Sequence, residues 1–325
     1  MQDLSNYPEE AHQPLISFIV TTYNLPIEYI TECLKSVMRL SLNKREREII
    51  LVDDGSDLTP LNELIDLRDE IIYLRQANRG LSAARNLGLR MASGSYIQFV
   101  DGDDFLLQAP YEHCLDIMRY HQPDLVLFTE SKKKDVKTPY NFEGPMSGRE
   151  YMRHNNLRGS ACGYIFGRQA LGSLRFREGS TVEDEEFTPQ LILRCEVVYV
   201  TAAEAYYYRQ RKDSLVHDKS EEYRQRRLQD AEQIIYHLKY LAERMPEADR
   251  IALNRRIAQL TADLLYNVIT FTHSGKQLDE TIHRLEERGL YPLPNKNYSR
   301  KYALFRKMIG HKLGRKLLLL ALGRK

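Results

Sequence analysis

Residues 96–104 read Tyr96-Ile97-Gln98-Phe99-Val100-Asp101-Gly102-Asp103-Asp104. The first five residues are mostly apolar or aromatic and predict a buried strand. Three carboxylates at the end of a strand repel one another, which favours a bound cation. Mg²⁺ and Mn²⁺ prefer carboxylate oxygens and often accompany substrate phosphates, and Gly102 leaves backbone room for both. A simple polar turn is the alternative, because Asp-Gly is a common turn pair.

The segments on either side of this strand alternate between two periodicities. Short apolar runs predict strands at residues 16–21, 49–52, 71–74 and 125–128. Helical spacing of apolar residues separates them, at 27–37, 61–67, 81–91 and 111–120. Such repeated β-α-β units predict an α/β fold, with a parallel sheet covered by helices on both faces.

Polar residues follow three of the predicted strands. Thr22, Tyr23 and Asn24 end the first, residues 53–57 end the second, and residues 101–104 end the fourth. Ligands of such sheets bind at the carboxyl ends of the strands. The three polar segments are therefore expected to line one cleft.

Several side chains of this cleft are candidates for contact with a nucleotide. Asp53 and Asp54 can accept hydrogen bonds from a base or a ribose, and Tyr23 can either stack on a base or pack under a loop. Arg79 and Arg85 can pair with a diphosphate or with the carboxylates of the cleft. For Arg85, a purely structural ion pair is the alternative.

Further candidates lie downstream. The acidic run at residues 183–186 suits either the first turn of a helix or a general base. Arg209 and Arg211 offer cations for phosphate. His217 is a candidate metal ligand, although a lone histidine is more often not one.

Missing motifs and the charge balance exclude several classes. The chain has no G-x-G-x-x-G after the first predicted strand, no P-loop, no H-E-x-x-H and no G-x-S-x-G. Residues 1–295 hold 37 Lys and Arg against 45 Asp and Glu, a net charge of −8, which argues against nucleic acid as a partner. The four scattered cysteines indicate reduced thiols in a cytoplasmic protein. The longest apolar run, residues 317–322, is far shorter than the roughly 20 residues needed to cross a bilayer.

The C-terminal third has a different pattern. We expect one domain at 1–218 and a wholly helical region at 219–325. The ten Lys and Arg after residue 295 have no acidic counterpart, and Phe305, Ile309, Leu313 and Leu317 recur every fourth residue. This pattern predicts a basic amphipathic helix that lies on an anionic membrane surface. The alternative is a last helix that packs on its own domain.

Four ordered motifs in the first half of the chain resemble the catalytic domain of glycosyltransferase family 2. They are residues 22–24, residues 52–57 (Val-Asp-Asp-Gly-Ser-Asp), residues 79–88 (Arg-Gly-Leu-Ser-Ala-Ala-Arg-Asn-Leu-Gly) and residues 99–104. Residues 183–187 and 207–211 resemble the downstream half of that domain. The resemblance covers about residues 15–217. It implies a GT-A fold with a Rossmann-like, mixed, mainly parallel sheet, to which this chain adds its C-terminal helices.

The resemblance also implies roles for individual residues. Asp184 would be the catalytic base, and Asp101 and Asp103 would hold Mn²⁺ or Mg²⁺, with His217 as a further candidate ligand. The expected nucleotide-sugar-binding residues are Thr22, Tyr23, Asn24, Asp53, Asp54, Arg79, Arg85, Asp101, Gly102, Arg209 and Arg211. The four acids at 183–186 leave open which carboxylate is the base.

The implied activity is transfer of one sugar, with inversion, from a nucleotide-diphospho-sugar, expected to be a UDP-sugar. The acceptor would be a glycan or a lipid-linked acceptor of surface polysaccharide or lipopolysaccharide synthesis, at the inner face of the plasma membrane. The chain lacks tryptophan and therefore the Q-x-x-R-W motif of the processive synthases in this family. Two alternatives stay open, a non-catalytic nucleotide-sugar-binding scaffold and a nucleotidyltransferase.

Overall fold

The computed structural model describes residues 13–136, 140–211 and 220–322. The contacts divide the chain into two compact units. The first comprises Met1–Ser147, Ser160–Gly179 and Arg194–Gln210, and the second comprises Gly148–Gly159, Ser180–Leu193 and Arg211–Lys325. Two segments expected in the first domain, 148–159 and 180–193, thus group with the C-terminal helices.

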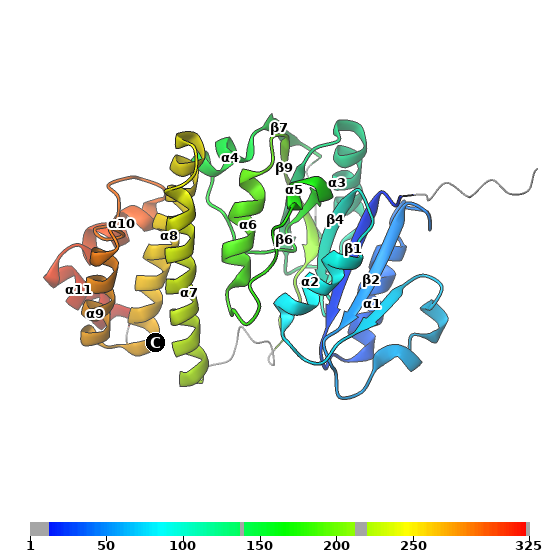
Figure 1. Cartoon of the computed structure of the whole chain (residues 1–325), viewed down its shortest axis with the longest axis horizontal. Coiled ribbons are helices and arrows are strands. Elements are labelled where there is room, and N and C mark those ends of the chain that lie inside the picture. Colours follow the sequence, from blue (N-terminus) through cyan, green and yellow to red (C-terminus); the bar gives the residue numbers. More distant parts are fainter. Residues whose placement is uncertain (1–12, 137–139, 212–219, 323–325) are drawn as a thin grey trace, which may run out of the picture. The chain divides into compact units, whose positions relative to one another are not determined.

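The first unit is built on one mixed β-sheet. In the described residues the order is β3-β2-β1-β4-β8-β6-β9-β5, and β7 pairs with β9. The strands are β1 (Ile16–Thr22), β2 (Arg47–Asp53), β3 (Ile72–Arg75), β4 (Tyr96–Asp101), β5 (Phe105–Leu106), β6 (Leu125–Ser131), β7 (Phe142–Met146), β8 (Tyr164–Gly167) and β9 (Val198–Tyr207). The strands β3, β2, β1 and β4 are parallel, and Figure 1 shows β1, β2 and β4 side by side.

The five strands predicted in the first 130 residues are confirmed, but the sheet is not a simple parallel succession. The fifth of them, β6, does not lie next to β4, because β8 is inserted between the two and is antiparallel to both. All seven residues of β1 are buried, whereas β3 at the edge is partly exposed. The buried centre explains the continuous apolar runs in the sequence.

Helices of the first unit pack on this sheet. They are α1 (Ile27–Met38), α2 (Leu81–Met91), α3 (Gln108–His121) and the short α5 (Arg168–Leu171). The helix predicted at 61–67 is wrong: the structure has two 3₁₀ turns, η1 (Pro60–Asn62) and η2 (Ile65–Leu67). Leu64 is buried there, but Leu61 and Ile65 are exposed, so no continuous apolar face is available to hold an α-helix.

The second unit is helical in its described part. It contains α4 (Gly148–His154), α6 (Glu183–Leu193), α7 (Glu221–Ala242), α8 (Glu247–Thr272), α9 (Gly275–Glu287), α10 (Arg300–Ile309) and α11 (Lys312–Leu322). The long helices α7 and α8 run side by side (Figure 1), and α4, α6 and α9 also pack on α8. Ser220 caps α7, because its side chain accepts a hydrogen bond from the Tyr223 N–H.

The predicted basic helix at the C-terminus is two helices, not one. Gly310 and His311 separate α10 from α11. Ile309 is fully buried, whereas Leu313 and Leu317 are exposed, so the predicted four-residue stripe is not one face. No helix in the described residues is both long and apolar enough to cross a membrane.

Candidate functional site

The register of three neighbouring strands brings the polar strand ends together. Thr21 of β1 lies opposite Asp101 of β4, and Thr22 of β1 lies opposite Asp53 of β2. These pairings hold the ends of β2, β1 and β4 at one edge of the sheet. The polar strand ends that the sequence predicted to lie together are therefore adjacent in the first unit.

Asp53 is completely buried and is surrounded by donors. Its Oδ1 accepts the N–H of Ser56 at 2.9 Å. Its Oδ2 accepts the Tyr73 hydroxyl at 2.8 Å and lies 3.6 Å from Nε of Arg75. These contacts fix the loop after β2, so Asp53 has a structural task whether or not it also contacts a nucleoside.

Asp54 joins this loop to the start of α2. Its Oδ1 accepts the backbone N–H of Arg79 at 3.0 Å and the side-chain amide of Gln76 at 2.7 Å, and its Oδ2 accepts the N–H of Gly80 at 2.8 Å. A carboxylate at a helix N-terminus is favoured by the helix dipole. The guanidinium of Arg79 itself lies toward Glu178, at 2.6 Å.

The residues after β1 form a clasp with the loop after β2. Asn24 adopts a left-handed backbone, its N–H donates to Oγ of Ser56 at 2.9 Å, and its side-chain amide exchanges hydrogen bonds with Asp57. Tyr23 beside it is 48% exposed, so its ring is accessible for stacking rather than packed beneath a loop. The buried Thr22 hydroxyl has no partner among the described residues, which leaves a polar atom for a ligand or water.

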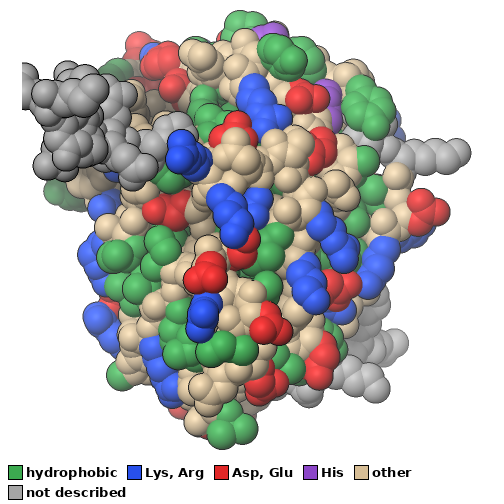
Figure 2. Space-filling model, turned by 90° about the vertical axis from the view of Figure 1, so that its right-hand side faces the viewer, with side chains coloured by type: hydrophobic (Ala, Val, Ile, Leu, Met, Phe, Trp, Pro, Cys, Tyr) green, Lys and Arg blue, Asp and Glu red, His purple; other side chains and the backbone are tan. Residues whose placement is uncertain are grey.

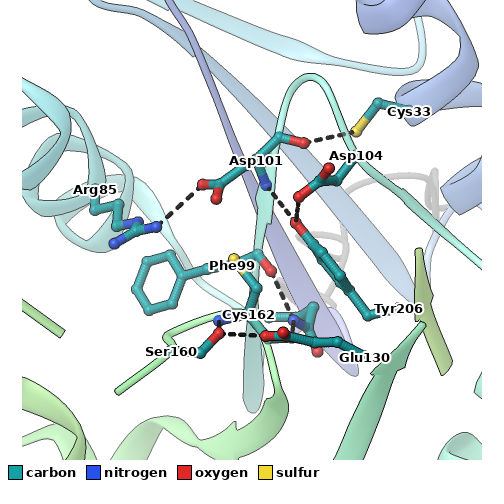
Figure 3. Close-up of polar contacts among 10 residues, drawn as sticks. Cys33, Arg85, Phe99, Asp101, Asp104, Glu130, Ser160, Cys162 and Tyr206 are labelled. Carbon is teal, nitrogen blue, oxygen red and sulfur yellow. Dashed lines mark hydrogen bonds and ion pairs between the residues drawn. The ribbon is translucent and has the colours of Figure 1, made fainter. Parts of the chain in front are cut away.

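Arg85 of α2 forms the buried ion pair that the sequence left as an alternative. It is 2% exposed, and its Nη2 lies 3.0 Å from Oδ1 of Asp101 (Figure 3). Its guanidinium also lies 5.9 Å and 5.3 Å from the ring centroids of Phe99 and Phe176. Arg85 therefore orients Asp101 and neutralises part of its charge.

Asp104 is hydrogen-bonded by residues at and just after the end of β9, about 100 positions later in the sequence. Its Oδ2 accepts the Tyr206 hydroxyl at 2.8 Å, and its Oδ1 accepts the backbone N–H of Arg209 at 2.7 Å. The Tyr206 hydroxyl also accepts the Asp101 N–H at 3.1 Å, so one phenol bridges two acids of the loop (Figure 3). Burial, together with the charges of Asp101 and Asp103, raises the pKa of Asp104 to about 8.

Arg209 reinforces the same loop. Its Nε donates to the backbone carbonyl of Asp103 at 2.6 Å, and its Nη2 pairs with Glu32 of α1. Its guanidinium lies 4.3 Å from the centroid of the Tyr29 ring. Since Arg209 is mostly buried, we interpret it first as a clamp on the loop.

Gly102 is required by a close approach of two backbones. A Cβ at this position would lie 2.7 Å from the carbonyl oxygen of Thr21 and 3.2 Å from Leu25. The Gly102 N–H donates to that same carbonyl at 2.8 Å. Packing of the protein therefore accounts for this glycine, in addition to any room that a ligand needs.

A divalent cation fits the chemistry of this loop. Burial raises the pKa of the Cys33 thiol, the charges of Asp104, Asp101 and Asp103 raise it further, and the Cys33 Sγ donates to the Asp101 carbonyl at 3.8 Å. No group of three or more His, Cys, Asp and Glu side chains in the described residues is arranged to hold a metal ion. Carboxylate oxygens such as those of Asp101 and Asp103 are the ligands that Mg²⁺ and Mn²⁺ prefer, and a cation held by one or two carboxylates would take its remaining ligands from phosphate oxygens.

The other sequence candidates belong to the second unit or lie outside the described residues. Asp184 and Arg211 belong to the second unit, where Asp184 lies in the first turn of α6. Two of its acidic neighbours are engaged within that unit, because Glu185 pairs with Arg256 and Glu186 pairs with His237. His217 lies outside the described residues.

Sequence reasoning gave Asp104 no role of its own, although it is the last acid of the Asp-Gly-Asp-Asp run. It took Tyr206, in the run 206–211, only as a possible hydroxyl for phosphate and not as a partner of the acidic loop. Nothing local links Tyr206 of β9 to Asp104, because the two residues are 102 positions apart in the sequence. Tyr206 is fully buried, and the pairing of β5 with β9 brings it next to the acidic loop. Its role as a partner of Asp104 can be recognised only when this pairing is known.

Comparisons with known proteins identify the family of the region that contains these strand ends. Residues 17–175 match the profile described as Glycosyl transferase family 2. The Minor teichoic acid biosynthesis protein GgaB of Bacillus subtilis is 27% identical over 210 residues, which are 61% of this chain and 23% of that protein. The chain spans between 23% and 39% of the length of the first curated relatives that it matches.

Two solved structures are similar over nearly the whole chain. The S. aureus protein TarS (residues 1–349) in complex with UDP-GlcNAc has a TM-score of 0.62 at 19% identity, over 91% of this chain and 90% of that one. The mannosyltransferase PcManGT of Pyrobaculum calidifontis, in complex with GDP-Man and Mn²⁺, has a TM-score of 0.57 at 15% identity, over 100% and 92%. At these identities the likeness concerns the fold, and it confirms the expected GT-A fold with additional C-terminal helices. Residues 17–175 of this chain form a glycosyltransferase family 2 domain.

Proposed function

We propose that this protein transfers one sugar from a nucleotide-diphospho-sugar to a hydroxyl group of a glycan or lipid-linked acceptor, in bacterial surface polysaccharide synthesis. The observation that carries the proposal is the alignment of Thr22, Asp53 and Asp101 at adjacent strand ends, inside the region that matches the family. The two similar solved structures contain UDP-GlcNAc, and GDP-Man with Mn²⁺, respectively, which supports a donor of this class. A UDP-sugar remains our expected donor.

The first unit supplies the groups that bind the donor. The exposed Tyr23 ring stacks on the base, and the unpartnered Thr22 hydroxyl is available to the nucleoside. Asp101 and Asp103 would hold Mg²⁺ or Mn²⁺, and the bound cation would supply positive charge beside the leaving diphosphate. Arg85, Tyr206 and Arg209 keep this loop in its bonded geometry.

Asp184 acts as the general base in this proposal. The acceptor hydroxyl attacks C1 of the sugar, its proton passes to Asp184, and the bond from C1 to the diphosphate oxygen breaks with inversion. The choice of Asp184 among the four acids follows the resemblance of residues 183–187 to the family, and Glu185 and Glu186 pair with Arg256 and His237.

Donor binding by the purified chain tests the proposal. We would measure the melting temperature with a panel of nucleotide sugars, with and without Mn²⁺, and compare Asp103→Ala with Asp116→Asn as a control on an exposed carboxylate of α3. We expect stabilisation by one donor only with Mn²⁺, lost in Asp103→Ala and kept in Asp116→Asn. A folded chain that no donor stabilises would overturn the proposal in favour of a scaffold.

We also propose that α11 holds the protein at an anionic membrane surface. Leu313, Leu317 and Leu320 follow one another at helical spacing and are 71%, 50% and 60% exposed, while Lys312 and Lys316 are exposed beside them. By contrast, Figure 2 shows a face where Lys and Arg are interspersed with Asp and Glu in its coloured part, so that the charges of opposite sign offset one another. Exposed leucines beside unopposed lysines suit the boundary of an anionic bilayer.

A charge introduced on α11 tests this second point. We expect Leu313→Glu with Leu317→Glu to abolish sedimentation of the protein with phosphatidylglycerol vesicles, without effect on donor binding. Leu58→Glu, at a residue of the first unit that is 87% exposed, is the matched control and should still sediment. Equal sedimentation of the double variant and the wild type would contradict the membrane role of α11.

A further inference from the structure

Helix α6 of the second unit, which carries Asp184, is fastened at its N-terminal end by several polar contacts. Just before the helix, the N–H and the hydroxyl of Thr181 both donate to Oδ2 of Asp230 on α7, at 2.9 Å and 2.8 Å. In its first turn, Glu185 pairs with Arg256 of α8, and Glu186 pairs with Nδ1 of His237 on α7. The start of α6 is thus tied to two of the C-terminal helices.

Arg256 is the most buried of these partners. Its side chain is 6% exposed, its Nη1 donates to the carbonyl of Leu157 at 2.9 Å, and its Nη2 meets the Glu185 carboxylate. A buried guanidinium is tolerated only with such partners, and its planar fork allows it to hold two acceptors in fixed directions. Through one side chain, Arg256 therefore joins three segments: its own helix α8, the helix α6, and the loop that follows α4.

The Glu185 carboxylate packs closely against the backbone of Gly159. Any Cβ at Gly159 would overlap the carboxyl carbon and both oxygens of Glu185. The backbone of Gly159 is not in the left-handed region, so the requirement there is for space and not for conformational freedom. A close fit on one side and a buried cation on the other leave the Glu185 side chain little freedom.

The position of Glu185 determines the direction of its neighbour. Successive residues of an α-helix are about 100° apart around the axis, because one turn contains 3.6 residues. When Glu185 is fixed toward Arg256, the rotation of the first turn is fixed, and with it the direction of Asp184. Glu186, the next residue in the sequence, pairs with His237 and so constrains the same rotation.

We propose that Arg256 is a positioning residue for Asp184, and that the C-terminal helices are the frame that orients the catalytic base. This inference rests on the proposed function, in which Asp184 is the base. It predicts that damage to the Glu185 clamp lowers turnover while donor binding is retained, because Arg256 acts on α6 and not on the nucleotide-sugar residues of the first unit.

Hydrogen–deuterium exchange of the full chain tests the clamp without any substrate. We expect Arg256→Gln to speed amide exchange in residues 186–193. Arg284→Gln is the matched control, since Arg284 makes an ion pair with Glu232 at 2.8 Å between α9 and α7 of the same unit. It should leave exchange in α6 unchanged. Unchanged exchange of α6 in Arg256→Gln would overturn the proposal.

A second variant covers the case in which Arg256→Gln does not fold. Gly159→Ala displaces the Glu185 carboxylate but leaves Arg256 in place, and it should also speed exchange in α6. Gly275→Ala is its control, because a Cβ there would meet its nearest neighbour, Leu319, at an ordinary 3.5 Å. If Gly159→Ala and Gly275→Ala exchange alike in α6, Glu185 does not set the helix.

Turnover then separates positioning from mere stability. With the donor that Mn²⁺-dependent binding identifies, we expect Arg256→Gln to lower kcat by roughly 100-fold and to leave donor KM unchanged, as a displaced catalytic group does. Placed on Asp184→Asn, Arg256→Gln should cause no further loss. A further loss in that background would contradict the positioning role, whereas full activity of Asp184→Asn alone would refute the base assignment and leave the exchange result standing.

Discussion

The two acidic runs of this chain, residues 101–104 and residues 183–186, have similar compositions and opposite surroundings. In the second run, Glu185 and Glu186 each meet a cationic or ionisable partner, Arg256 and His237. In the first run, the buried Asp104 meets a phenol and a backbone N–H instead of a cation, and its pKa is raised to about 8 by burial and by its acidic neighbours. Arg85 pairs with Asp101.

This difference suits the two runs to the different tasks proposed above. Carboxylates that are paired with fixed cations stabilise a helix and its packing. Carboxylates that keep an excess of negative charge are costly in the isolated protein, and that cost is offset when a divalent cation binds. The first run is therefore suited to bind a metal ion, and the second to hold one base in a defined direction.

The strongest test of the contrast is Asp103→Asn. We expect turnover to fall by about 1,000-fold or more, because the charge on the leaving diphosphate loses several kcal/mol of stabilisation. At the same time the melting temperature of the metal-free variant should not fall, since a like charge beside Asp104 has been removed. Turnover assays and metal-free thermal melts check both points, and a clearly lower melting temperature would contradict the excess of negative charge.

The next test removes the base from the paired run. Asp184→Asn should lower kcat by about 100-fold or more, the usual contribution of a general base. Donor binding, measured by Mn²⁺-dependent thermal shift, should be unchanged because Thr22, Tyr23, Asp101 and Asp103, the residues proposed above to bind the donor and its metal ion, belong to the first unit. Loss of donor binding together with turnover would show that Asp184 is not confined to proton transfer.

The sequence predicted those parts of this comparison that depend on local pattern. Residues 96–104 combine a β-branched and aromatic run with an acidic turn, so both the strand β4 and the loop after it could be placed without a structure. The insertion of β8 between β4 and β6 could not, because it depends on pairing between residues about 40 to 70 positions apart.

The same limit applies to partners of the site. The ion pairs of Arg85 with Asp101 and of Arg256 with Glu185 join segments that only the fold brings together. The sequence alone did not identify the partner of either arginine. At the C-terminus, the four-residue spacing from Phe305 to Leu317 suggested one helix, yet Gly310 separates two helices and Ile309 turns into the core. Periodicity predicted helicity there, but not the break or the buried face.

A smaller effect is expected from breaking a pair in the second run. Glu185→Gln leaves the buried Arg256 without its anionic partner, and we expect a loss of about 2 kcal/mol in the free energy of unfolding. This is below the value for a fully buried pair, because the Glu185 side chain keeps 30% of its exposure. Urea unfolding measures it, and a stability equal to that of the wild type would remove the contrast with Asp103→Asn.

The smallest effect is expected from removing the hydroxyl of Tyr206, the uncharged partner of Asp104 in the first acidic run. Tyr206→Phe removes the hydroxyl that bridges Asp104 and the N–H of Asp101, and leaves the ring in its buried position. We expect a loss of about 1–2 kcal/mol in the free energy of unfolding, because a buried carboxyl loses one donor. Since the loop still has the contacts of Arg85 and Arg209, Mn²⁺-dependent donor binding should weaken only several-fold. Complete loss of that binding would mean that the phenol, and not the two arginines, holds the loop in its binding geometry.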